Sequence, residues 1–275
     1  MAEPIPETRY DRIASGYARW WAPVLRTAAE RLLDLADAAV VAGARQVIDI
    51  GTGTGTLALA AIERWPAVEV TGIDASAGML EVARDAADAR LSTRDRRRYR
   101  TAAAVADRLP YPDASFDLAL SSFVLQLVPN RAAALRESRR VLRAGASLAW
   151  VTWLVGGTRF AADDIADAVL EEAGFDAPEA DPHCGDIASL ASAATAMRRA
   201  GFREVRVRDG LLEHAWDPEG YLGFLTEFDE DTLFTELEPG ERDEIVGRMR
   251  VRLEALSAGE LTLRLPIVYV SGRAA

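Results

Sequence analysis

The chain has 275 residues, of which 49% are hydrophobic and 27% charged, and these values indicate a folded globular protein. It is long enough to bury a core without disulfides or metal ions, and its single cysteine, Cys184, excludes an internal disulfide. The formal net charge of −11 argues against nucleic acid and anionic membranes as partners, because binding phosphate groups needs a cationic surface.

The first 45 residues are predicted to be helical, with apolar side chains at three- and four-residue steps and with Pro23 breaking or restarting the helix. An apolar run at 46–50 then ends in glycines, which is typical of a buried strand feeding a tight turn. Such alternation predicts a parallel sheet with helices on both faces and a switch point beside the first strand. The expected segments that follow are helix 56–64, strand 68–73, helix 77–91, strands 99–106 and 116–121, helix 131–142 and strand 147–153.

The pattern changes after Trp153. Helical stretches at 163–173 and 187–199 have no strand between them and look like an inserted cap. Strand character resumes at 201–208, and 219–256 is mostly helical. A final strand is expected at 261–270, limited by Gly259 and Pro266, since proline removes a ladder donor.

A glycine-rich turn joins the first strand to the next helix, in the run Asp49-Ile-Gly51-Thr-Gly53-Thr-Gly55. Glycines let the backbone turn tightly and approach a ligand, while free N–H groups point outward. A purely structural loop is the alternative. The spacing differs from the G-x-G-x-x-G dinucleotide fingerprint, because the third glycine comes one residue early and an acidic residue stands two positions before the first.

Two more acidic residues, Asp74 and Asp107, follow the next two predicted strands. Asp74 closes the next strand, where a carboxylate can accept both hydroxyls of a ribose; alternatively it accompanies Ser76 in capping the following helix. Asp107 lies in the link between the third and fourth strands, where it is alternatively a turn former before prolines.

Together these motifs, over roughly residues 45–155, resemble the class I S-adenosylmethionine-dependent methyltransferases. The run 139–145 matches the family's helix-to-strand corner, except that Ala144 stands where proline is common. Among subfamilies the chain is most similar to the small-molecule group with ubiquinone, menaquinone and malonyl-thioester methyltransferases, whose N-terminal segment resembles 10–17. The resemblance implies an α/β fold, a doubly wound, mostly parallel, Rossmann-like sheet with N-terminal helices and a helical cap insertion.

The resemblance also implies a division of the chain and a set of residues that bind the donor, S-adenosylmethionine. We expect an N-terminal helical lid at 1–45, a donor-binding core at 46–155, a helical cap insertion at 156–200, and the rest of the sheet with a helical insertion at 201–275. In the family, the residue matching Tyr17 lies over the methionine end, and that matching Asp107 accepts from the adenine amino group while the next backbone N–H groups address the ring. The expected donor-binding residues are Tyr17, Asp49, Gly51, Thr52, Gly53, Gly55, Asp74, Ala75, Met79, Ala106, Asp107, Arg108, Leu109, Ser121 and Ser122.

The implied reaction is direct in-line attack of a substrate nucleophile on the donor's methyl group, with no protein nucleophile. His183 and His214 are the histidines available as a base, and neither is assigned. The acceptor site is expected between the carboxyl edge of the sheet and a lid of N-terminal and post-153 segments, for a small, largely apolar acceptor. Its candidate lining residues, about half of which we expect to be core aromatics instead, are Tyr17, Trp20, Phe123, Gln126, Trp153, Phe160 and Tyr221.

Two other functions stay open: a nicotinamide-dependent oxidoreductase, disfavoured by the glycine spacing, and a donor-binding module without catalysis. No metal is expected, because His183 and His214 are the only histidines and a zinc site normally assembles four ligands. The N-terminus has no basic region followed by an apolar run, and no stretch of about 18 uncharged apolar residues occurs. We therefore expect a cytoplasmic protein.

Overall fold

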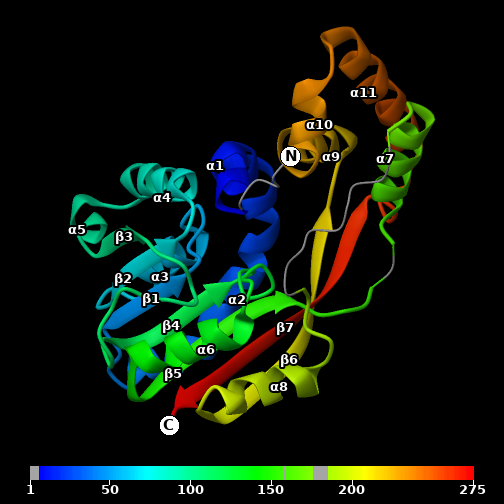
Figure 1. Ribbon diagram of the computed structural model, residues 1–275. Coiled ribbons are helices and arrows are strands. Elements are labelled where there is room, and N and C mark those ends of the chain that lie inside the picture. The colour runs from blue at the N-terminus through cyan, green and yellow to red at the C-terminus, as the bar shows by residue number, and fades with distance from the viewer. Residues whose placement is uncertain (1–5, 158, 176–184) are drawn as a thin grey trace.

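The computed structural model describes residues 6–157, 159–175 and 185–275, and a seven-stranded sheet runs through it (Figure 1). The strand order is β3-β2-β1-β4-β5-β7-β6, and all neighbours are parallel except that β7 runs antiparallel to both β5 and β6. The expected doubly wound, mostly parallel sheet is confirmed, and its order reverses beside β1. The strands are β1 Gln46–Ile50, β2 Glu69–Asp74, β3 Tyr99–Ala103, β4 Phe116–Ser122, β5 Leu142–Trp153, β6 Phe202–Ala215 and β7 Thr262–Ala274.

Helices cover both faces of this sheet because successive strand residues point to opposite sides. Val47 of β1 packs in one core with α2 and α3, whereas Ile48 packs in a second core with α6 and α8 (Figure 1). Among the described residues, no helix is both long and apolar enough to cross a bilayer. The helices of the core are α2 Ala22–Val41, α3 Thr56–Arg64, α4 Ala77–Arg90, α5 Thr93–Arg96, α6 Arg131–Val141 and α8 Leu190–Arg199.

A helical cap stands beyond the end of the sheet to which the long strands β6 and β7 project (Figure 1). We use the word cap for α7 Ala161–Glu172, α9 Pro218–Phe224, the π-helical η2 Leu225–Asp229, α10 Asp231–Glu236 and α11 Pro239–Leu253. The two helices of the expected insertion 156–200 lie in different places, because α7 belongs to this cap while α8 packs on the sheet through Met197, against Trp150. The division of the chain into units stays a proposal.

The N-terminal segment is helical from α1 Pro6–Gly16 through α2, with one five-residue π-helical turn, η1 Tyr17–Trp21, between them. Pro23 lies in the first turn of α2, as expected for a helix that restarts there. Proline is tolerated at this position because the N–H that it lacks would have no partner within the helix. The wide π-helical turn η1 precedes Pro23 and keeps α1 and α2 continuous.

Several expected strand boundaries were wrong. Both β6 and β7 are longer than expected, since each pairs along its full length with the other and β7 pairs with β5 as well. Pro266 lies inside β7, where its carbonyl still accepts a hydrogen bond from the N–H of Leu154, so the proline removes a donor without ending the strand. β5 begins at Leu142 instead of 147, and β3 ends at Ala103 instead of 106.

Candidate donor and acceptor sites

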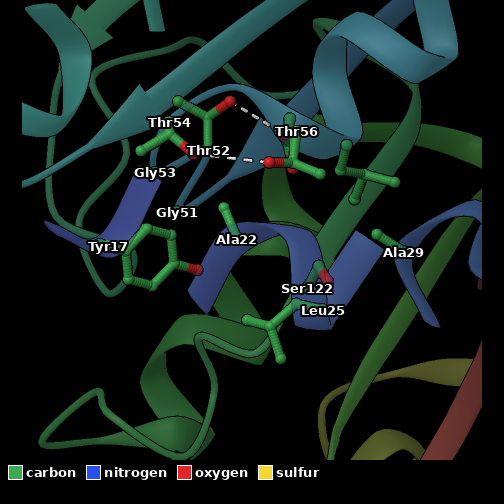
Figure 2. Close-up of a pocket in the computed structure, with 12 residues that line it drawn as sticks. Tyr17, Ala22, Leu25, Ala29, Gly51, Thr52, Gly53, Thr54, Thr56 and Ser122 are labelled. Carbon is green, nitrogen blue, oxygen red and sulfur yellow. Dashed lines mark hydrogen bonds between the residues drawn. The ribbon is translucent and has the colours of Figure 1, made fainter. Parts of the chain in front are cut away.

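The glycine turn after β1 is the first element of the site. Gly51 has φ +71°, and a Cβ there would lie 2.2 Å from a methyl carbon of Val124, so only glycine fits. Gly53 has φ +53°, and the space around its missing Cβ is open. The turn therefore offers bare backbone to a small cavity, which lies opposite Tyr17 in Figure 2.

Asp49 lies beneath this turn and is only 1% exposed. Its Oδ2 accepts a hydrogen bond of 2.7 Å from the Thr52 hydroxyl, but its Oδ1 has no hydrogen-bond partner. Burial raises the pKa of Asp49 to about 7. The hydrogen bond from Thr52 lowers this pKa, whereas the nearby charge of Asp74 raises it. A buried, unpaired carboxylate oxygen beside a cavity is costly and is suited to a cationic group that enters there.

Asp74, at the end of β2, ties the same turn to the neighbouring strand. Its Oδ2 accepts from the N–H of Gly53 at 2.8 Å, and its Oδ1 accepts from the N–H of Ser76 at 3.0 Å. Burial raises the pKa of Asp74, against these backbone hydrogen bonds. Ser76 itself caps α4 by accepting from the N–H of Met79, and Asp74 accompanies it there through the hydrogen bond from the Ser76 N–H. Its carboxylate keeps lone pairs for a further donor such as a ribose hydroxyl.

The cavity has a volume of about 30 Å³, room for roughly one water molecule. A site for a nucleotide-sized ligand needs roughly 300 Å³ or more, so this cavity is only a part of the space that such a ligand would occupy. The residues that line the cavity are Tyr17, Ala22, Leu25, Ala29, Asp49, Gly51, Thr52, Gly53, Thr54, Thr56, Leu57 and Ser122.

The N-terminal helix α1, which precedes the cavity-lining Tyr17 in the chain, is held by polar contacts that the sequence analysis missed. Asp11 accepts from the Ser76 hydroxyl at 2.6 Å and from the N–H of Gly78 at 2.8 Å, and these hydrogen bonds lower the pKa of Asp11. A Cβ at Gly78 would lie 2.9 Å from the Cα of Asp11, so glycine permits this close approach. On the other side, Arg12 forms a two-pronged ion pair with Asp231 of the cap at 2.8 and 3.3 Å. The helix therefore bridges α4 and the cap.

Aromatic rings extend from the cavity toward the cap. The Phe123 and Trp153 rings lie 4.2 Å apart between centroids, and Trp21 continues the cluster 6.2 Å from Trp153 and 5.1 Å from Phe224. Tyr17 contacts Phe228, the neighbouring ring of that cluster, at 5.5 Å. Of the expected acceptor residues, Phe123, Trp153 and Tyr17 thus lie together, and Trp21 joins them unforeseen.

Trp20 instead packs on the cap. Its ring covers Gly223, and its indole N–H donates to Glu227 at 2.7 Å. Trp21 therefore takes the place among the rings that was expected for Trp20. The five-residue π turn explains this difference, because it rotates both tryptophans relative to the positions that an α-helical spacing predicts.

Phe160 and Tyr221 lie deeper in the cap. Their ring centroids are 5.7 Å apart, and the Tyr221 hydroxyl donates to Asp163 at 2.8 Å. Tyr221 is 1% exposed and reaches the rings near the cavity only through Phe224. Both therefore behave as core aromatics of the cap.

Gln126 stabilises the backbone at Phe123, a role that the sequence did not predict. Phe123 has φ +55°, a strained conformation for a residue with a side chain. The Gln126 side-chain amide donates to the Phe123 carbonyl at 2.8 Å and accepts from the Thr152 hydroxyl. Gln126 therefore holds the strained backbone at Phe123, whose ring packs against Trp153.

The link after β3 is a tight turn around Asp107, whose carboxylate is half-buried and has no hydrogen-bond partner among the described residues. The expectation that the next two N–H groups address a ring does not fit this structure. The N–H of Arg108 donates to the Val105 carbonyl at 3.2 Å and that of Leu109 to Glu137 at 2.8 Å.

The remaining expected residues are spread around the turn. Ser122 lines the cavity, whereas the Ser121 hydroxyl donates to the Ile50 carbonyl at 2.9 Å. Gly55 is the N-cap of α3. Met79 is buried, Ala106 is half-buried and Ala75 is exposed. Of the candidate bases, His214 packs its ring on Trp216, and His183 lies outside the described residues.

The fold and the glycine turn define a Rossmann-like α/β protein whose candidate ligand site lies at the carboxyl ends of β1 and β2. Residues 47–145 match the family model described as a methyltransferase domain. The chain is 32% identical over 223 residues to the ubiquinone/menaquinone biosynthesis C-methyltransferase of Syntrophotalea carbinolica, an alignment that covers 73% of this chain and 84% of that relative. The chain therefore belongs to the S-adenosylmethionine-dependent methyltransferase family.

Other relatives match over a smaller part of the chain. The chain is 38% identical over 122 residues to the malonyl-[acyl-carrier protein] O-methyltransferase of Geobacter sulfurreducens, with 44% of this chain covered. It spans 43% of the length of that relative, and 41% of that of the demethylmenaquinone methyltransferase of Deinococcus radiodurans. The fold matches that of the YcgJ protein of Bacillus subtilis with a TM-score of 0.56 at 22% identity, over 87% of this chain and 97% of that one.

Proposed function

We propose that the protein transfers a methyl group from S-adenosylmethionine to a small, largely apolar acceptor. The observation that carries this proposal is the pairing of an open glycine turn with the unpartnered, buried Oδ1 of Asp49, both beside one cavity. The donor, when bound, supplies an activated methyl group on a sulfonium and carries an ammonium group. The buried carboxylate of Asp49 suits that ammonium, because the ion pair would satisfy its orphaned oxygen.

The protein's own contribution is then to bind, orient and exclude water. Asp74 presents a carboxylate, already fixed by two backbone N–H groups, to the ribose hydroxyls. The carboxylate of Asp107 remains a proposed partner of the adenine amino group. Tyr17, Ala22 and Leu25 cover the cavity, and the contacts of Asp11 and Arg12 hold the helix that precedes them. This cover would exclude water and align the two reactants, an effect that favours direct displacement.

The acceptor is proposed to enter between the glycine turn and the rings of Phe123, Trp21 and Trp153. These rings present apolar surface, and Gln126 and Thr152 satisfy each other beside them, which leaves few polar anchors. Such a wall favours a small acceptor with a flat or apolar body. We assign no general base.

Calorimetric titration with S-adenosylmethionine, S-adenosylhomocysteine and NAD tests the donor. The proposal expects binding of the first two and none of NAD. A panel of small aromatic and aliphatic nucleophiles, screened for release of S-adenosylhomocysteine, then tests transfer. Binding of NAD in place of the sulfonium compounds would refute the assignment, and donor binding with no turnover on any acceptor would favour a binding module.

A further inference from the structure

A second concave site lies at the opposite end of the parallel strands from the glycine turn. It has a volume of about 440 Å³, within the range of sites that hold small organic ligands. The groove lies between the C-terminal end of α2 and the starts of β5 and β6, whereas the glycine turn follows the carboxyl end of β1 (Figure 1). We call it the α2–β5 groove, and its lining residues are Leu35, Ala38, Ala39, Ala42, Gly43, Ala44, Asp117, Arg143–Ala149, Glu204, Arg206 and Ser271–Arg273.

The groove is open because the residues that face each other across it are small. Ala38, Ala39 and Ala42 form the wall on α2, and the floor on the sheet includes Ser147 and Ser271. The alanines give the wall an apolar surface.

Arginines supply the charge of the groove, in a protein whose net charge is −11. Arg143 hydrogen-bonds to Asp117, whose carboxylate also accepts from two backbone N–H groups, and Arg273 donates to the Gly145 carbonyl at 3.1 Å. Arg206 differs from both, because it has no hydrogen-bond or ion-pair partner among the described residues. All of its N–H donors are therefore available to a ligand, whereas Arg143 and Arg273 are partly engaged.

Local backbone geometry places that arginine. The pairing of β6 with β7 shifts register between Arg203 and Arg206, which marks a β-bulge. Inside the bulge, Glu204 has φ +51°, a strained conformation for a residue with a side chain. Bulges of this kind redirect side chains near functional sites, and this one turns both Glu204 and Arg206 to the groove.

We propose that the α2–β5 groove binds an amphipathic organic anion, with its acidic group on Arg206 and its apolar body on the alanine wall of α2. The guanidinium recognises a carboxylate, phosphate or sulfonate in the same way, by paired N–H donors. Glu204 and Asp117 disfavour a ligand of high negative charge, so a single acidic group is expected. The site is separate from the donor cavity, and the proposal does not depend on the donor or on methyl transfer.

The probe for this site is 8-anilinonaphthalene-1-sulfonate, whose fluorescence reports binding of an anion with an aromatic body. Arg206→Glu is expected to weaken its binding by about tenfold, because a charge-assisted contact becomes a repulsion. The matched control is Arg203→Glu, an exposed position on the same strand that does not line the groove but makes the same change in net charge. Its affinity is expected to stay within about twofold of the unmodified protein.

Two further measurements separate the alternatives. Ala38→Trp, at an exposed position of α2, should fill the groove and remove binding while thermal unfolding is unchanged. Competition by 1-naphthoate and by 1-naphthyl phosphate distinguishes a carboxylate from a phosphate source. The proposal is overturned if saturating S-adenosylhomocysteine displaces the probe, if both glutamate variants weaken it equally, or if uncharged N-phenyl-1-naphthylamine binds with the same dependence on Arg206.

Discussion

Asp49→Asn is expected to remove the pH dependence of donor binding. The buried carboxyl of Asp49 has a pKa of about 7 in the unliganded protein, and the proposed ion pair with the donor's ammonium needs its ionised form. With that pKa, roughly one tenth of the protein is ionised at about pH 6 and roughly three quarters at about pH 7.5. Affinity for the donor should therefore rise by roughly eightfold over this interval.

Calorimetric titrations at the two pH values, at one ionic strength, measure this change. The asparagine variant is the control, because titration of the donor's own amino group affects both proteins alike. Thr52→Val is the second arm: it removes the hydrogen bond that lowers the Asp49 pKa, so the rise in affinity should move to higher pH. The reasoning is refuted if the unmodified protein and the asparagine variant share one pH profile.

The same substitution has a predicted effect on stability. Burial raises the Asp49 pKa from 3.8 to about 7. The stability of the folded protein with a protonated Asp49 is therefore fully present below about pH 4, where the unfolded chain is protonated too, and it is lost as the pH rises through about 7. Above pH 7 the penalty is at most about 4 kcal/mol, from 1.36 kcal/mol per unit. Chemical denaturation at about pH 8 should therefore find the asparagine variant more stable, with a smaller gain at low pH.

Three other substitutions test the site. Asp74→Ala should weaken donor binding by about 1 to 3 kcal/mol in calorimetry, because ribose hydroxyls lose a charged acceptor, and unchanged affinity in a folded variant would remove Asp74 from the site. Gly53→Val should abolish binding, since its side chain would occupy the open space beside the turn and its φ of +53° is strained for valine; normal titration of a folded variant would contradict the assigned turn. Asp11→Ala should speed amide hydrogen exchange at Gly78 and quicken donor association and release in stopped-flow, because α1 loses two hydrogen bonds to α4, whereas unaltered exchange would show that α1 is held by other contacts.

The sequence signals for the proposed donor site are local. A glycine turn and the acids at two adjacent strand ends are short-range patterns, and parallel strands bring their carboxyl ends to one edge. The structure places Asp49, Gly53 and Asp74 together as that rule requires. The expectation for the backbone N–H groups after Asp107 did not fit, because the partner of Leu109 is Glu137, a residue on a helix distant in sequence.

The aromatic residues were harder to place. Helical spacing pointed to Trp20, but the π turn at η1 brings Trp21 to the rings and Trp20 to the cap. A turn with five residues instead of 3.6 leaves no clear mark in the sequence, since its hydrogen bonds are stabilised by packing. Gln126 was expected to line the acceptor site, yet it is committed to Phe123 and Thr152.

The sequence by itself determined the fold class and the location of the glycine turn, because strand alternation, glycine spacing and acidic strand ends depend on residues near one another in the chain. Only the tertiary structure decided how α1 is held against α4 and where the second groove lies. Asp11, Ser76 and Gly78 meet across two helices, and Arg206 reaches the end of α2 through a bulge. Such contacts join residues far apart in sequence, and they depend on packing of the whole chain, which no local pattern encodes.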